Sequence, residues 1–258
     1  TYDAFEGPQE AFEGNNPDYR LWSRHNPCNW LQVRENEMDP AHLTFLHTRL
    51  FGTQFAEVYG KLAALEWQET PLGMIYIATR RWKDALYVRS NDMILPNVIR
   101  VAGIEDAEGE TLFDRRASSL NWVVPIDDWN CITIGYSDIN KKMIIPGSQG
   151  YIDRMAAKGK QAVGAGDVGQ TGDPTYDQRQ RCPGDWDAWV SQGKITNHFR
   201  EHLGSTDAGI NMYRQLLRRE IKKMENNIAL TSVSNNYPIK TYCHNTVIKV
   251  PKGKENEE

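Results

Sequence analysis

The strongest constraint on the fold is a series of short apolar segments between residues 62 and 136. They are rich in β-branched and aromatic residues, and Gly, Pro, Asp and Asn separate them at close spacing. The segments are Leu65–Trp67, Gly73–Thr79, Leu86–Val88, Val98–Val101, Ser118–Val124 and Ile132–Tyr136. Parallel neighbours need long crossovers, whereas antiparallel neighbours can be joined by short turns. The spacing therefore predicts strands that form an antiparallel meander.

Helical patterns lie on both sides of these segments. Apolar residues recur at helical spacing over residues 30–51, where Asp39-Pro40 has the form of a helix start, with an N-cap acid followed by proline. Helical signals return over residues 186–226 and are clearest over 208–224, where one face is apolar and the opposite face is basic. The predicted class is α+β, an antiparallel sheet with flanking helices and a long C-terminal helix.

Three other segments show neither pattern. Residues 1–28 are polar, contain prolines and are predicted to form an irregular N-terminal arm. Residues 146–184 are rich in Gly, Asp and Gln, as is typical of a long loop that covers or gates a site. Residues 249–258 form a charged tail that we expect to fray. The remaining residues, 29–248, are predicted to form one domain.

Charge and hydropathy exclude several classes of partner. The formal net charge is −4, and no long block of Lys or Arg occurs, so the chain is not expected to bind nucleic acid or an anionic membrane. No apolar run approaches the ~18 residues of a membrane span. The four cysteines are scattered without a C-x2-C pair, which excludes a zinc knuckle and favours a reducing cytoplasm.

The segment richest in metal-ligand types runs from residue 35 to residue 47. Asp39 and His42 are three apart and share a helix face. His42 and His47 are five apart, which on a regular helix separates them by about 140°. Both can bind one ion only if the helix is distorted, for example by a π-type turn. The alternative is that both are partly buried helix residues satisfied by hydrogen bonds.

A wider set of residues resembles the catalytic domain of Rieske non-haem iron oxygenases, the ring-hydroxylating oxygenase α subunits. The resemblance covers about residues 29–221 and is nearest to the phthalate and phenoxybenzoate dioxygenase branch. The strings that carry it are Asn29-Trp30, Glu35-Asn36, Asp39-x2-His42-x4-His47 and the run from Gly184 to Gln192. It implies a helix-grip, START-like domain in which the sheet wraps around the long C-terminal helix.

The resemblance implies a mononuclear Fe(II) held by His42, His47 and Asp185. Such a set of two histidines and one carboxylate occupies one face of an octahedral ion and leaves up to three positions for water, O2 and substrate. Asp187, two residues further on, is the rival for the carboxylate position. Trp186 and Trp189 flank the ligand and are the aromatic candidates for lining the pocket.

The same resemblance assigns roles to two residues that do not bind the iron. Asp39 would connect His42 to a histidine of a Rieske [2Fe–2S] centre on a neighbouring subunit and so relay electrons; the alternative is a simple helix cap. Asn36 would lie close to the iron, and its alternative is a polar residue at a helix start. We expect both residues to belong to the catalytic site.

The activity implied is O2-dependent hydroxylation or oxidative demethylation of an aromatic substrate, which can carry a carboxylate, as in the catabolism of aromatic compounds. Whether the enzyme is a monooxygenase or a dioxygenase stays open. The implied partners are a ferredoxin or flavin reductase that draws on NAD(P)H, and two further copies of the chain in a homotrimer.

One part of the family pattern does not occur. A Rieske cluster requires C-x-H followed by C-x2-H, and neither string is present. The sequence begins at Thr1 without a methionine. We therefore expect the cluster-bearing Rieske domain to be absent from this chain, and the [2Fe–2S] cluster to belong to the complete enzyme.

Two other functions remain open from the residues alone. His198-x2-Glu201-His202 matches the inverted zinc-protease motif, in which two histidines bind zinc and the glutamate acts as general base, so it would make the chain a zinc metallopeptidase. A sheet with a gating loop could also be a metal-free module that binds a small molecule. The bound metal separates the three hypotheses: iron, zinc or none.

Overall fold

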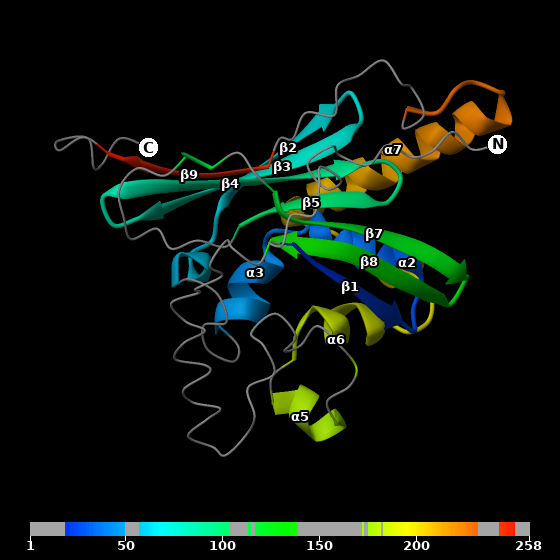
Figure 1. Cartoon of the computed structure of the whole chain (residues 1–258), viewed down its shortest axis with the longest axis horizontal. Coiled ribbons are helices and arrows are strands. Elements are labelled where there is room, and N and C mark those ends of the chain that lie inside the picture. Colours follow the sequence, from blue (N-terminus) through cyan, green and yellow to red (C-terminus); the bar gives the residue numbers. More distant parts are fainter. Residues whose placement is uncertain are drawn as a thin grey trace.

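The computed structural model describes residues 19–49, 57–103, 113–114, 117–138, 172, 175–181, 183–231 and 243–250. Its centre is one nine-stranded antiparallel sheet (Figure 1). The strands are β1 (Tyr19–Asn26), β2 (Ala64–Thr70), β3 (Gly73–Trp82), β4 (Ala85–Ile94), β5 (Val98–Ala102), β6 (Phe113–Asp114), β7 (Ala117–Asp127), β8 (Asn130–Asp138) and β9 (His244–Lys249).

The predicted meander is confirmed. Strands β2, β3, β4, β5, β7 and β8 are successive neighbours in chain order, and every pair is antiparallel. All six predicted segments lie in these strands, and every strand extends beyond its predicted segment. Short polar turns therefore set the order of the sheet, as the spacing indicated.

Strand β1 corrects the expectation of an irregular arm over residues 1–28. All eight of its residues pair in antiparallel register with β8. Leu21 on this strand is 80% exposed, so backbone pairing more than side-chain burial holds β1 in place. This explains why its sequence lacks an apolar period. Residues 1–18 of the predicted arm lie outside the described residues.

The other two segments without a pattern are only partly described. Helix α5 (Tyr176–Arg181) lies within the predicted loop 146–184 and corrects it there. This helix buries none of its residues, so it has no apolar face by which sequence reasoning recognises a helix. Most of the rest of the loop, and residues 251–258 of the predicted tail, lie outside the described residues.

The helices that pack on the sheet cover one of its faces (Figure 1). They are α2 (Trp30–Glu37), α3 (His42–Thr44), the 3-10 helix η2 (Glu57–Gly60), α6 (Asp185–Val190) and α7 (Ala208–Glu225), and the π-helix η1 (Phe45–Arg49) continues from α3. One buried cluster joins α7 to strands β3–β5, a second joins α3 and η2 to β4 and β9, and a third joins α2 and α6 to β7 and β8.

Helix α7 confirms the predicted long C-terminal helix, and with it the α+β class. Its residues Tyr213 and Leu216 are buried against Met74 and Tyr76 of β3. The Tyr213 hydroxyl also donates to the Pro96 carbonyl at 2.6 Å. The helix therefore lies along the sheet through its apolar side, as its sequence pattern predicted.

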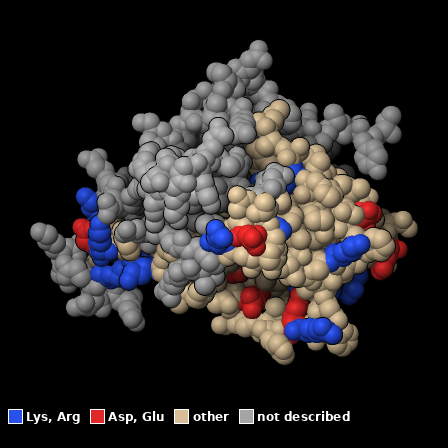
Figure 2. Space-filling view, turned by 90° about the horizontal axis from the view of Figure 1, so that it is seen from below, with Lys and Arg blue, Asp and Glu red and all other residues tan. Residues whose placement is uncertain are grey.

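The described surface carries both signs of charge. In the view of Figure 2, which is turned by 90° from that of Figure 1, acidic and basic side chains are interspersed over the described part of the surface. No helix among the described residues is long and apolar enough to span a membrane.

Candidate metal centre

The two histidines lie on a segment that changes its helical type. The α-helical turn His42–Thr44 continues directly into the π-helix Phe45–Arg49. Because a π-type turn joins residue i to residue i+5, it brings residues five apart to the same side. The imidazole rings of His42 and His47 have centroids 5.4 Å apart. The predicted distortion is therefore present, although the helix begins at His42 and not at Asp39-Pro40 as the sequence suggested.

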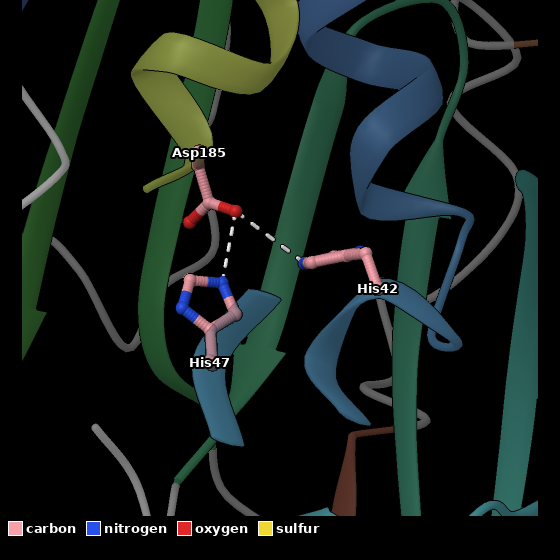
Figure 3. Close-up of side chains that lie close together, drawn as sticks. All are labelled: His42, His47 and Asp185. Atoms are coloured by element: carbon pink, nitrogen blue, oxygen red, sulfur yellow. Dashed lines mark hydrogen bonds and ion pairs between the residues drawn. The ribbon is translucent and has the colours of Figure 1, made fainter. Parts of the chain in front are cut away.

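Asp185 meets both histidines from a distant part of the chain. It is the first residue of α6, and its Oδ1 lies 2.9 Å from His47 Nε2 and 3.4 Å from His42 Nε2 (Figure 3). One ligand atom from each side chain falls within 4.8 Å of the others. The three side chains come from separate elements and point toward a common centre (Figure 3).

The spacing and donor types fit a metal ion. Ligand atoms on adjacent corners of an octahedron, each about 2.1 Å from the ion, lie about 3 Å apart. The two distances to Asp185 Oδ1 are close to this value. Two imidazole nitrogens and one carboxylate oxygen are the donor set of facial-triad Fe(II) sites. The His47 side chain is 1% exposed and His42 is 18% exposed, so one side of the site faces outward.

Asn36 and Asp39 both lie beside the three converging side chains. Asn36 Nδ2 donates to Asp185 Oδ1 at 3.3 Å. His42 Nδ1 is in hydrogen-bond contact with the main-chain carbonyl of Asp39, and the Asp39 carboxylate lies further away, at 3.9 Å from the same nitrogen. Asp39 Oδ1 accepts from Ala41 N at 2.9 Å and so stabilises the turn before the helix. Asp39 therefore orients His42 through its backbone.

The rival carboxylate, Asp187, is not part of this group. Its Oδ2 accepts from Gly184 N at 3.3 Å, and its Oδ1 lies 3.4 Å from Arg179. It therefore stabilises the start of α6. The flanking Trp186 and Trp189 are 9% and 3% exposed and belong to the buried cluster against β7 and β8. They hold the helix that presents Asp185.

Glu37 is a neighbour of the site that sequence reasoning missed. Desolvation raises the pKa of its carboxyl group; Arg34 opposes this, the charge of Asp185 adds to it, and His42 and Arg89 lower the pKa. It ends helix α2, where a glutamate is ordinarily a solvated surface residue. No motif singles it out, since only the folded chain brings it near Asp185 and Arg89.

The zinc-protease motif is contradicted by its local structure. His198 lies in a 3-10 turn that ends at Arg200, and His202 follows in non-helical chain and is exposed. The motif requires both histidines on one face of a helix. Glu201 is held by Arg214, at 2.6 Å and 2.9 Å, so its carboxylate is not available as a general base. His198, Glu201 and Glu35 come close together around that arginine.

No protein-family model matches the chain. The oxygenase subunit of tert-butanol monooxygenase / tert-amyl alcohol desaturase from Aquincola tertiaricarbonis is 33% identical over 204 residues, which cover 74% of this chain and 42% of that protein. Subunit alpha of phenoxybenzoate dioxygenase from Ectopseudomonas oleovorans is 28% identical over 201 residues, covering 76% and 43%. The chain is a homologue of Rieske oxygenase subunits. Another relative is the oxygenase subunit of 5,5'-dehydrodivanillate O-demethylase from Sphingobium sp. (strain NBRC 103272 / SYK-6), 26% identical over 238 residues and covering 86% and 50%.

The chain spans about half the length of these Rieske oxygenase subunits, or somewhat less. Among solved structures, dicamba monooxygenase bound to 3,6-dichlorosalicylic acid gives a TM-score of 0.44 at 15% identity, covering 82% of this chain and 61% of that one. NdmA of Pseudomonas putida CBB5 with caffeine gives a TM-score of 0.44 at 13% identity, covering 85% and 56%.

Proposed function

We propose that this chain is the catalytic part of a Rieske oxygenase, which uses O2 to hydroxylate or oxidatively demethylate an organic substrate. The observation that carries the proposal is the convergence of His42, His47 and Asp185 on one centre. The relatives support the reaction class, since their names include a monooxygenase, a dioxygenase and an O-demethylase. Two of them are named for aromatic compounds and one for tertiary alcohols; we propose an aromatic substrate.

The three side chains would hold Fe(II). When bound, this ion supplies a redox-active centre with coordination positions left open for O2. A carbonyl oxygen only accepts hydrogen bonds, so the contact between His42 Nδ1 and the Asp39 carbonyl requires the proton on Nδ1. The lone pair of Nε2 then faces Asp185 and is available to the metal. The Asn36 amide holds the carboxylate oxygen that meets both imidazoles.

Electrons would come from a Rieske [2Fe–2S] cluster outside this chain, since neither of its ligand strings occurs here. We assign the electron relay to Asp39, whose side chain is 25% exposed next to His42 and so can contact another subunit. The assembly proposed is a homotrimer served by a ferredoxin or flavin reductase. We place the protein in a reducing cytoplasm, because its four cysteines are scattered and a chain of this size does not need disulfides.

The catalytic domain proposed is residues 29–248 with β1 added to it. Strand β1 pairs along its whole length with β8, so it belongs to the same sheet. Removing it would leave β8 with an unpaired edge.

Nitric oxide binding tests the proposed function on the chain itself. The protein is loaded anaerobically with Fe(II) and exposed to nitric oxide, which binds open positions of non-haem iron and gives a characteristic electron paramagnetic resonance signal. We expect that signal at about one per chain, and a change in it when an aromatic acid such as benzoate is added. A protein that takes up no iron, or whose iron binds no nitric oxide, would contradict the proposal.

A further inference from the structure

Two of the four cysteines meet in the interior beside helix α6. Strand β1 ends at Asn26, which lies directly opposite Cys131 in the β1–β8 pairing, and Cys28 follows in the bend before α2. Both cysteines are 0% exposed, belong to one buried cluster and are free thiols. The two thiols are hydrogen-bonded to each other. The fold therefore joins two sulfur atoms from distant parts of the sequence.

The surroundings of Cys131 favour its ionised form. The hydrogen bond from Cys28 does most to hold the pKa of Cys131 below its ordinary value; desolvation opposes it, and Asn26 and the charge of Arg34 add to it. Asn26 Nδ2 donates to Cys131 Sγ at 3.7 Å. The contact between the thiols, together with burial, raises the pKa of Cys28. Cys131 is therefore the stronger nucleophile, and Cys28 remains protonated.

Arg34 of α2 is a buried cation that is only partly paired. It is 0% exposed, and its Nη2 donates to Asn121 Oδ1. Its Nε and Nη1 have no hydrogen-bond partner within the part of the chain that the structure describes. A buried guanidinium is costly without opposite charge nearby. A thiolate at Cys131 would supply such charge, so Arg34 and the thiolate stabilise each other.

The two thiols also pack against the helix that presents Asp185. Trp186 and Trp189 of α6 lie in the same buried cluster as both cysteines. Two sulfur atoms in non-bonded contact must approach to about 2.05 Å when they form a disulfide. Because protein interiors are close-packed, the neighbouring side chains must follow that movement. A disulfide here would therefore shift the packing of α6 and, with it, the position of Asp185 relative to His47.

We propose that Cys28 and Cys131 form a redox switch, in which hydrogen peroxide converts the two thiols to a disulfide and thereby weakens iron binding at the candidate metal centre. The effect on iron rests on the proposed function, whereas the disulfide does not. In a reducing compartment the two thiols are the resting form, and a thiol reductant reverses the oxidation.

The chemistry of the switch takes two steps. The Cys131 thiolate attacks one oxygen of hydrogen peroxide, the O–O bond breaks, and the products are a sulfenic acid and hydroxide. The hydroxide takes up the proton that Cys131 gave up and becomes water. The Cys28 sulfur then displaces the sulfenic oxygen, which leaves as a second water carrying the Cys28 proton. Two thiols are thus oxidised to one disulfide while one peroxide is reduced to two waters.

Peptide mapping of the metal-free chain after treatment with hydrogen peroxide tests the disulfide. The peroxide is removed with catalase, the protein is unfolded, free thiols are alkylated, and the digest is analysed by mass spectrometry. We expect one linked species that contains Cys28 and Cys131 and is lost on treatment with dithiothreitol. Cys243 is the internal control, because it is equally buried but donates to Asp92 at 3.2 Å, and burial raises its pKa. It should be recovered as the alkylated thiol.

Titration with Fe(II) under anaerobic conditions tests the effect on iron. The oxidised chain, freed of peroxide, should bind iron about tenfold more weakly than the reduced chain, and reduction should restore the affinity. The control is Cys131→Ser, which lacks the nucleophile and should bind iron equally well before and after peroxide. If this variant does not fold, Cys131→Ala replaces it.

Absence of the linked species, or a disulfide that uses other cysteines, would overturn the proposal. A Cys28–Cys131 disulfide that leaves iron affinity unchanged would contradict the switch. If neither form of the chain binds iron, the proposed function and the effect on iron both fail, and the linked species still establishes the disulfide.

Discussion

His47 and Asp185 are 138 positions apart in the sequence, and His47 Nε2 lies 2.9 Å from Asp185 Oδ1. The first residue lies on a π-helical turn and the second begins a short helix held by two buried tryptophans. The α3 turn that leads into the π-helix and helix α6 each pack on the sheet through apolar contacts, so the folded chain sets the separation of the two residues in advance. A metal bound here would find its ligands already close together.

The two aspartates of α6 are expected to differ in their effect on metal. Asp185→Asn removes the carboxylate that meets both histidines, so iron content should fall to near zero. Asp187→Asn should keep its iron and lower stability by about 1 kcal/mol, because it weakens only the contact at the start of the helix. Iron analysis of both variants, with urea unfolding, measures the difference; the reverse pattern would make Asp187 the ligand.

Asp39→Asn should separate iron binding from turnover. The main-chain carbonyl that contacts His42 Nδ1 is unchanged by this substitution, so iron content should remain near that of the native protein. Loss of the carboxylate charge should lower turnover at least tenfold in the complete enzyme supplied with its reductase. Full activity would leave Asp39 with a role only in the turn that it stabilises.

Arg214 is expected to be a main source of stability for the C-terminal helix. It donates to Glu35 at 2.5 Å and to Glu201 at 2.6 Å, which ties α7 to α2 and to the 3-10 turn. Arg214→Met leaves two carboxylates without their partner and should lower the free energy of unfolding by roughly 3 kcal/mol. Urea unfolding measures this loss. The control is Arg218→Met, at an exposed position, which should change the free energy of unfolding little.

The contact between Arg214 and Glu201 also predicts that the stability of the protein depends on pH. The hydrogen bond from Arg214 holds the pKa of Glu201 below its ordinary value. A depressed folded-state pKa stabilises the protein above the unfolded value, about 4.3 for glutamate, and that stabilisation is lost as pH falls through the folded value. The gap in stability between native and Arg214→Met proteins should therefore narrow below about pH 4. A gap that widens on acidification would contradict this assignment.

Much of the fold follows from local chemistry that the sequence carries. Short polar turns force neighbouring strands to be antiparallel, so the meander is predictable. The apolar residues of α7 lie on one side of the helix and indicate which side is buried, so the last helix is predictable as well. Strand β1 is not predictable, because Leu21 remains exposed and the strand pairs with the backbone of β8, which lies more than a hundred residues away in the sequence. The contact between Cys28 and Cys131 is not predictable either, since it depends on the same pairing of distant strands.

The candidate site, like the fold, was predictable from the sequence only in part. The five-residue spacing of His42 and His47 by itself required a distorted helix if both were to meet one ion, and the π-helix meets that requirement. The choice of Asp185 over Asp187 rested on family resemblance, and only the folded chain shows which carboxylate faces the histidines. Glu37 carried no sequence signal, because its burial and its nearness to Asp185 and Arg89 arise only in the folded chain.

The central claim is tested most directly by metal analysis of the purified chain. The account predicts about one iron per chain, lost in His42→Ala and retained in His198→Ala, whose imidazole belongs to the group around Arg214. A stoichiometric zinc that survives His42→Ala would contradict it.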